Sequence, residues 1–133
     1  MATNFRTTLR TARAQAFITD CGAGAKMKFW NGTRPAAVTS TAVGNTLLAT
    51  VTFGATIGTA ISGAVDFDEA GSTQASASHV AGTPTFVDLE TSAGALVSRT
   101  DIGAGATSWP FTGTVTVGQN VTLTALLFTE GNA

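Results

Sequence analysis

From residue 26 onward, apolar residues recur at every second position, in short runs that end at turn-forming residues. The clearest run is Lys26-Met27-Lys28-Phe29-Trp30, in which Met27 and Phe29 fall on one face of an extended strand. Asn31-Gly32 follows it and is a strong turn signal. Because a period of two is typical of strands with one buried face, this pattern restricts the body of the chain to β architectures.

Further runs of this kind predict further strands. They lie at 47–53, 61–67, 74–80, 85–90, 96–102, 114–117 and 121–128. Ser92-Ala93-Gly94 predicts a hairpin between the runs at 85–90 and 96–102, and Gly118-Gln119-Asn120 predicts a hairpin between the last two. The sequence therefore predicts a mainly β fold, a β-sandwich or jelly roll of about eight short antiparallel strands, with a short N-terminal helix.

The helix is predicted over residues 4–19, where the apolar period is that of one helical face. That face consists of Phe5, Leu9, Ala12 and Ala16, with Phe17 or Ile18 as a further large anchor, and a second stripe consists of Arg6, Arg10 and Arg13. Thr3 or Asn4 is expected to cap the start, and Gly22 follows the end. A helix with so thin an apolar face is marginal alone in water, so we expect it to pack on the body or on a partner.

A chain of 133 residues is expected to form a single domain, with residues 1–22 as a helical arm and residues 23–133 as a sandwich body. Charged residues make up 11% of the sequence, against about 25% in an average soluble domain. Such a surface suits a protein covered by neighbours, or one solvated through Thr and Ser hydroxyls. Composition leaves both interpretations open.

The basic residues are concentrated near the start of the chain. Of the seven, six lie in the first 34 positions: Arg6, Arg10, Arg13, Lys26, Lys28 and Arg34. Of the eight acidic residues, Asp20 alone lies in that part. The net charge of −1 argues against nucleic-acid binding by bulk electrostatics. Ends of opposite sign instead favour contact with an acidic surface or with another copy of the chain.

The sequence carries no pattern that predicts an enzyme, a metal site or a cofactor. Gly22-Ala-Gly-Ala-Lys26 lacks the spacing of a phosphate loop, so a turn is the better interpretation. Asp66 and Asp68 share one side of a strand, where solvated polar residues are a simpler explanation than a calcium site or a glycosidase pair. His79 is expected to be structural, and Cys21 to be a buried or idle thiol.

No apolar stretch approaches the length of a membrane span, and no unbroken apolar segment follows the first bases as it does in a signal peptide. We therefore expect no membrane partner, and synthesis in a cytoplasm.

Several segments resemble a family of small virion structural proteins of tailed bacteriophages. In chain order they are NFRTTLRTA, KMKFWNGTRPA, LLATVTFG, GTPTFVDLETSAGALVSRTDIG and GQNVTLTALLFTEGNA. The resemblance spans nearly the whole chain, and its most distinctive piece is the strand and turn from Phe29 to Ala36. These motifs are structural, and the family has no catalytic residues to carry over.

The resemblance implies a capsid cement (decoration) protein on the exterior of the phage head, made in the host cytoplasm. Its partners would be the major capsid protein and other copies of itself, and it would stabilise the shell by binding the assembled form. The residues suggested for partner binding are Arg6, Arg10, Arg13, Trp30, Arg34 and Trp109. A tail, neck or fibre-associated virion protein is an alternative, and a carbohydrate-binding adhesin module with an exposed Trp platform is another.

Overall fold

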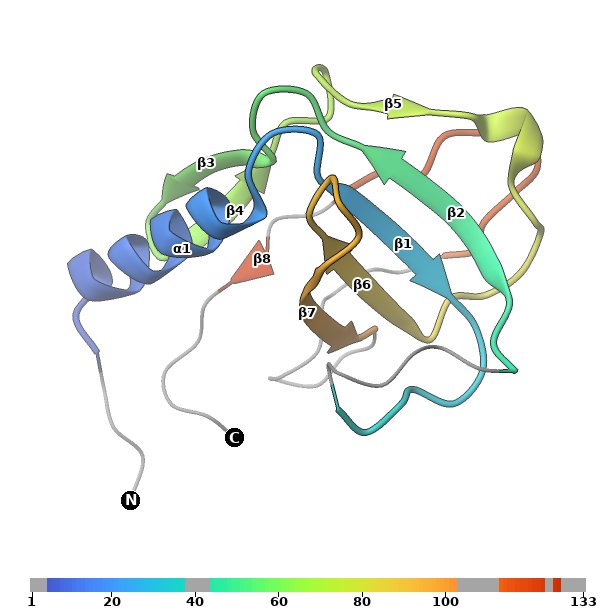
Figure 1. The fold of residues 1–133 in the computed structure, drawn as a ribbon, viewed down its shortest axis with the longest axis horizontal. Coiled ribbons are helices and arrows are strands. Elements are labelled where there is room, and N and C mark those ends of the chain that lie inside the picture. The colour runs from blue at the N-terminus through green and yellow to red at the C-terminus, as the bar shows by residue number, and fades with distance from the viewer. Residues whose placement is uncertain (1–4, 38–43, 103–112, 124–125, 128–133) are drawn as a thin grey trace.

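The computed structural model describes residues 5–37, 44–102, 113–123 and 126–127, and Figure 1 shows its one α-helix and its short strands. In chain order the elements are α1 (Thr7–Cys21), β1 (Lys26–Trp30), β2 (Leu47–Thr52), β3 (Gly58–Ile61), β4 (Ala64–Phe67), β5 (Thr73–Gln74), a 3-10 helix (Ser76–Ser78), β6 (Phe86–Glu90), β7 (Leu96–Asp101) and β8 (Leu126–Leu127).

The strands form two antiparallel sheets. The larger has five strands in the order β5-β2-β1-β6-β7, and the smaller has three in the order β3-β4-β8. α1 lies against β3 and β4 at one side of the molecule (Figure 1). The predicted fold class is confirmed: the protein is mainly β, a small sandwich-like arrangement of short antiparallel strands with one short helix near the N-terminus.

β1 lies at the centre of the larger sheet, and its alternation sets the core. Met27 and Phe29 are buried, as predicted, whereas the other three residues of the strand are partly exposed. The residues paired with these two on the neighbouring strands are Val51, Ala49, Leu89 and Val87, and all four are buried. Burial of each large side chain contributes about 1.5–3 kcal/mol, so these central strands hold the sheet together.

β2 departs from strict alternation at Leu48. Strict alternation over the predicted run 47–53 would place Leu47 on the same face as Ala49 and Val51, but Leu47 is partly exposed and Leu48 is buried. Phe29 pairs with Ala49 while Trp30 pairs with Leu47, so Leu48 is an extra residue in the ladder. An extra residue of this kind is a β-bulge, which turns one side chain toward the other face. The bulge is the reason that the predicted face is correct for one half of the strand only.

The single strand predicted over 61–67 is wrong, because the segment folds back on itself. β3 ends at Ile61 and β4 begins at Ala64, and the two pair as an antiparallel hairpin. Ser62 and Gly63 form the turn with φ of 50° and 79°. Two successive residues with positive φ are typical of a tight hairpin turn, and Ser-Gly is one of the dipeptides that signal it.

The weak strand predicted over 74–80 is also mostly wrong. β5 ends at Gln74, and Ser76–Ser78 form a 3-10 helix. The chain returns to the edge of β2 at Val80, whose backbone N–H donates to the Leu48 carbonyl at 2.8 Å. The segment consists mainly of small residues without β-branching, which have little preference for a strand. It therefore forms a 3-10 helix instead.

In the described part of the two segments, the hairpin predicted between 114–117 and 121–128 is not formed. Val115 pairs with Gly82, and β8 pairs with β4. The turn at Gly118 is present, with φ of 84°, but the chain on each side of it pairs with a segment far away in sequence. Alternation identifies a strand and does not identify its partner, which explains the error.

α1 spans Thr7–Cys21 instead of the predicted 4–19. Its N-cap is Arg6, whose side chain makes no capping hydrogen bond, and the suggested caps Thr3 and Asn4 lie outside the described residues. Gly22 ends the helix with φ of 69°, as expected, and its N–H donates to the Ile18 carbonyl. The helix packs on the β3–β4 hairpin of its own body, and the chain then continues into β1.

Candidate partner-binding surface

The face by which α1 packs is not the predicted one. The buried residues of the helix are Ala14, Ile18 and Cys21. Leu9, predicted to be packed, is 47% exposed, and Ala12 and Ala16 are exposed as well. The helix has two thin apolar stripes, and small residues on the inner one let the helix approach the β3–β4 hairpin closely. Counting apolar residues cannot choose between such stripes, because the choice depends on the partner's shape.

Arg10 lies at the start of the packed stripe and is used within the fold. A Cβ on Gly63 would meet the Arg10 Cβ at 3.1 Å, so this arginine lies against the β3–β4 turn. The neighbouring Thr11 Oγ1 accepts a hydrogen bond from the Gly63 N–H at 2.9 Å, and Arg10 Nη2 donates to Thr7 Oγ1 at 3.2 Å. Arg10 therefore helps to seat the helix on the hairpin.

The outer face of α1 consists of Leu9, Ala12, Arg13 and Ala16, and Phe5 lies just before the helix begins. The Arg13 guanidinium carbon lies 5.4 Å from the centroid of the Phe5 ring, a cation–π contact. Leu9 lies one helical turn before Arg13. Arg6 is exposed beside this face, and none of the described carboxylates lies within ion-pair distance of Arg6 or Arg13. The outer face is thus an apolar stripe flanked by two arginines.

The charges on α1 are placed against its own dipole. No acidic residue lies in the first turn and no basic residue in the last. The arginines instead occupy the N-terminal half, where the partial charge of the helix is positive, and Asp20 lies at the other end. Arginines at the N-terminal end do not stabilise the helix. Their position is therefore not explained by a contribution to helix stability. A carboxylate supplied from outside would be favoured at this end.

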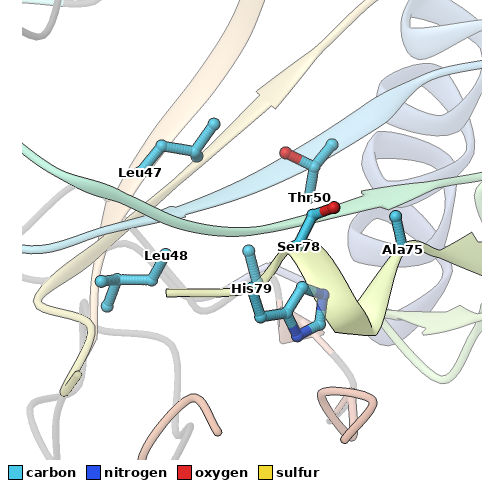
Figure 2. Close-up of a pocket in the computed structure, with 7 residues that line it drawn as sticks. Leu47, Leu48, Thr50, Ala75, Ser78 and His79 are labelled. Atoms are coloured by element: carbon cyan, nitrogen blue, oxygen red, sulfur yellow. The ribbon is translucent and has the colours of Figure 1, made fainter. Parts of the chain in front are cut away.

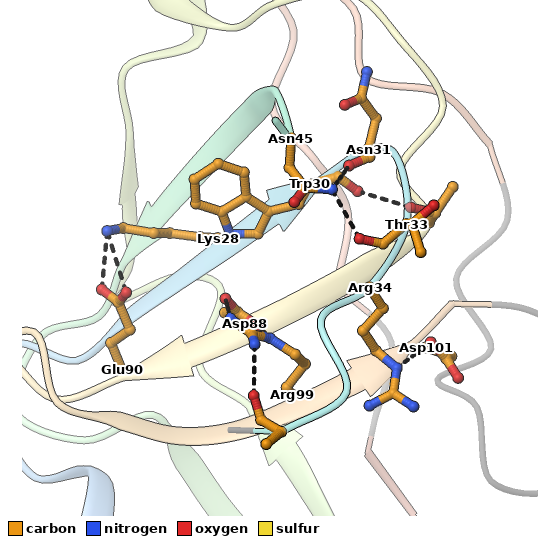
Figure 3. A network of polar contacts seen from close by, with 12 residues as sticks. Lys28, Trp30, Asn31, Thr33, Arg34, Asn45, Asp88, Glu90, Arg99 and Asp101 are labelled. Atoms are coloured by element: carbon orange, nitrogen blue, oxygen red, sulfur yellow. Dashed lines mark hydrogen bonds and ion pairs between the residues drawn. The ribbon is translucent and has the colours of Figure 1, made fainter. Parts of the chain in front are cut away.

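Asp88 and Arg99 form a buried ion pair that the sequence analysis missed. Arg99 Nε donates to Asp88 Oδ1 at 2.7 Å and Arg99 Nη2 donates to Oδ2 at 2.9 Å (Figure 3). The Arg99 side chain is 2% exposed and the Asp88 side chain is 4% exposed. The hydrogen bonds to Asp88 raise the pKa of Arg99 above its ordinary value, against the opposing effect of burial. The predicted hairpin turn at 92–94 indicates that Asp88 and Arg99 lie on neighbouring strands, but it is the register shift between Leu89 and Glu90 that places them opposite each other.

The loop after β1 is fastened over this pair. Arg99 Nη1 donates to the Ala37 carbonyl at 2.9 Å, and Arg34 Nε lies 2.7 Å from Asp101 Oδ1. Asn45 Nδ2 donates to the carbonyls of Asn31 and Thr33 at 2.7 and 3.0 Å. Arg34, a predicted partner-binding residue, therefore holds its own loop to the end of β7, in an ion pair that remains partly exposed.

Trp30 is stacked and not presented as a flat platform. Its ring lies 6.3 Å from the Phe86 ring, its cross-strand neighbour, with 9° between the planes. Phe86 also contacts Arg99, whose guanidinium carbon is 5.6 Å from the ring centroid. Trp30 Nε1 is buried with no hydrogen-bond partner among the described residues. The other predicted tryptophan, Trp109, lies outside the described residues.

His79 is buried, as the structural interpretation expected, and it connects two segments. Its Nδ1 lies 3.0 Å from the Gln119 carbonyl oxygen, which only accepts, so Nδ1 carries the proton. Its Nε2 is buried without a hydrogen-bond partner in the described part of the chain. A half-open pocket of about 250 Å³ lies beside it, shown in Figure 2. Its lining is mainly apolar and comprises Leu47, Leu48, Ala49, Thr50, Ala75, Ser78 and His79.

Cys21 is buried at the end of α1, as predicted. Burial, and to a lesser extent the neighbouring charge of Asp20, raises the pKa of its thiol from 9.0 to about 11. A thiol with so high a pKa is a poor nucleophile at neutral pH.

The acidic residues Asp66, Asp68 and Glu69 lie at the end of β4 and in the turn after it, and all three are exposed. Asp68 Oδ1 accepts from the Gly71 N–H at 3.0 Å, and Glu69 Oε1 accepts from the Leu123 N–H. Within the described residues no three His, Cys, Asp or Glu side chains gather as they would at a metal ion.

In the same part of the chain no helix is long and apolar enough to cross a membrane. The chain matches no protein-family model, no curated protein and no solved structure in the comparisons made with each.

Proposed function

We propose that this chain is a structural virion protein that decorates the head of a tailed bacteriophage by binding the assembled major capsid protein. The observation that carries the proposal is the outer face of α1. It presents Leu9, 47% exposed, beside Arg6 and Arg13, which have no ion-pair partner among the described residues. An apolar stripe flanked by unpaired arginines is suited to an acidic protein surface, on a capsid subunit or on a neighbouring copy.

The remainder of the fold supports a passive role. Three ion pairs lie on or beside the larger sheet: Lys28 with Glu90, Arg34 with Asp101, and Arg99 with Asp88. These pairs fasten a loop and a hairpin to the central strands and so keep the body rigid. A rigid body loses little conformational entropy on docking, so weak contacts repeated over a lattice can add up to firm attachment.

The sequence resemblance to small tailed-phage virion proteins supports a place in the particle. The tail, neck or fibre position remains the alternative within that class. The adhesin interpretation loses one of its two platforms, since Trp30 is stacked on Phe86 and only partly exposed.

The test is reconstitution. Heads of the encoding phage that lack this protein are mixed with the purified chain, pelleted, and heated. We expect the wild-type chain to pellet with the heads and to raise their melting temperature. The double variant Arg6→Glu/Arg13→Glu should bind much more weakly, whereas Lys26→Glu, a charge reversal away from the helix, should bind as the wild type does. Failure of the wild-type chain to bind or protect the heads would exclude the proposal.

A further inference from the structure

We propose that the outer face of α1 in one copy docks on the acidic turn after β4 in the next copy, so that copies associate head to tail. The inference depends on the proposed function in one respect only, that the copies associate on the phage head. It names the neighbouring copy as the acidic surface that α1 meets.

The two surfaces lie at opposite ends of the helix. Arg6 and Leu9 are at its N-terminal end. The acidic turn lies near its C-terminal end, because the Gly24 N–H, just after the helix, donates to the Gly54 carbonyl at 2.8 Å. A Cβ on Gly54 would in turn meet the Gly71 carbonyl oxygen of the acidic turn at 3.1 Å. The base of β4 is fixed to the same region by the stacking of Phe67 on Phe53, at 5.8 Å.

At 1.5 Å per residue, the rise along the helix axis to its end at Cys21 is roughly 22 Å from Arg6 and roughly 12 Å from Arg13. Neither arginine forms an ion pair with Asp66, Asp68 or Glu69 within one molecule. The arginines and the acidic turn can pair between two molecules that are related by translation along the helix, with or without rotation. A contact between two different surfaces of the same chain is heterologous, and it produces a ring or an open row of copies.

The charges of the two surfaces are complementary. Arg6 and Arg13 are not paired with a described carboxylate, and Asp66 is exposed and makes no side-chain hydrogen bond with a described residue. Asp68 and Glu69 accept backbone hydrogen bonds and keep their charge for a second partner. Carboxylates placed at the start of α1 would interact favourably with both the arginines and the helix dipole.

The surroundings of the acidic turn also fit the apolar part of the face. Ala55 and Ala70, which follow Gly54 and precede Gly71, are both exposed. Small side chains leave room for Leu9 to approach the backbone there. In the second copy, two exposed alanines beside the acidic turn can therefore contact Leu9 while the carboxylates contact the arginines.

The experiment is sedimentation velocity of the full chain over a range of concentrations at low and high salt. The wild-type chain should associate at low salt and dissociate at high salt, because exposed charge pairs are screened. Arg6→Glu/Arg13→Glu alone and Asp66→Arg alone should each associate at least about tenfold more weakly, which corresponds to the loss of a close charge contact. Lys26→Glu, a single charge reversal that lowers the net charge half as much as the double arginine variant does, should associate as the wild type does.

Mixing the two variants gives the decisive result. The Asp66→Arg chain keeps an intact arginine face, and the Arg6→Glu/Arg13→Glu chain keeps an intact acidic turn. Together they should form a mixed complex that neither forms alone, because the intact arginine face of the first can meet the intact acidic turn of the second. A wild-type chain that stays monomeric at low salt, or a mixture that fails to associate, would overturn the inference. Either result leaves head binding to be measured separately, so the failure of this inference and of the proposed function can be told apart.

Discussion

Asp88 and Arg99 face each other across β6 and β7 and share two hydrogen bonds of 2.7 and 2.9 Å in a position almost closed to solvent. Arg99 is the last base in the chain, and its third contact reaches the Ala37 carbonyl in the loop after β1. One side chain thus connects two neighbouring strands and a loop distant in sequence. The pair makes the outer side of the sheet rigid.

Removal of one partner of this pair should be costly. Arg99→Met leaves the Asp88 carboxylate buried without its cation, and breaking a buried pair in this way costs roughly 3–5 kcal/mol. Urea unfolding measures the loss. The double variant Asp88→Leu/Arg99→Met removes both charges and should be more stable than either single variant, because no unpaired charge remains. Arg34→Met breaks the exposed pair and should cost at most about 1 kcal/mol. Equal losses of unfolding free energy in Arg99→Met, the double variant and Arg34→Met would contradict the assignment of Asp88 and Arg99 as a buried ion pair.

Gly58 should tolerate no side chain. A Cβ there would lie 2.0 Å from the Asp66 carbonyl oxygen on the paired strand, so β3 and β4 would have to separate. Gly58→Ala is expected to lower the free energy of unfolding by more than about 2 kcal/mol, as overpacking does. Gly94→Ala is the matched control. Its Cβ would meet nothing within 4 Å, so only the strain of its φ of 91° remains, about 1 kcal/mol. Similar losses at both sites would show that backbone strain alone matters.

The buried thiol of Cys21 should make stability depend on alkaline pH. Its pKa is about 11 in the folded chain and 9.0 ordinarily, so folding favours the protonated form. The stabilisation is complete below pH 9 and is lost as the pH rises from 9 through 11. Thermal unfolding over this range should show a decline that Cys21→Ala lacks. A thiol reagent at pH 8 should label the folded chain slowly and the unfolded chain fast, and fast labelling of the folded chain would disprove the burial.

His79 should hold residues 113–123 against the segment that contains the 3-10 helix. Loss of its Nδ1 donor in His79→Ala would leave the Gln119 carbonyl unpaired and loosen the neighbouring contacts. The amides of Val115 and Gly118, which donate to the Gly82 and Ser76 carbonyls, should then exchange with deuterium faster. His79→Asn restores a donor at this place and should recover part of the protection. Unchanged exchange in both variants would show that the backbone bonds suffice.

Local patterns in the sequence predicted the elements whose causes are local. The alternation of Met27 and Phe29 identified the central strand, and Gly22 identified the end of the helix. The turn at 92–94 identified the β6–β7 hairpin, whereas the pairing of Asp88 with Arg99 also depends on a register shift between Leu89 and Glu90 that alternation does not reveal.

The wrong predictions concern features that depend on parts of the chain distant in sequence, such as the buried face of the helix and the pairing of strands. Leu9 and Ile18 lie on different stripes of one helix, and the β3–β4 hairpin selects Ile18. Val115 pairs with Gly82 and not with its predicted neighbour across a turn. Of the predicted partner-binding residues, Arg34 and Arg10 are held by contacts within the fold. Arg6 is exposed, and Arg13 is partly exposed over the Phe5 ring; neither has an ion-pair partner among the described residues. Sequence periodicity could not separate these two groups.

Electron cryomicroscopy of the phage particle tests the central claim most directly. The account predicts density for this fold on the exterior of the head, repeated over the capsid lattice. The outer face of α1 should be covered there by an acidic surface of a neighbouring copy or a capsid subunit. Density confined to the tail or neck, a particle without this chain, or an α1 whose outer face meets only solvent would contradict it.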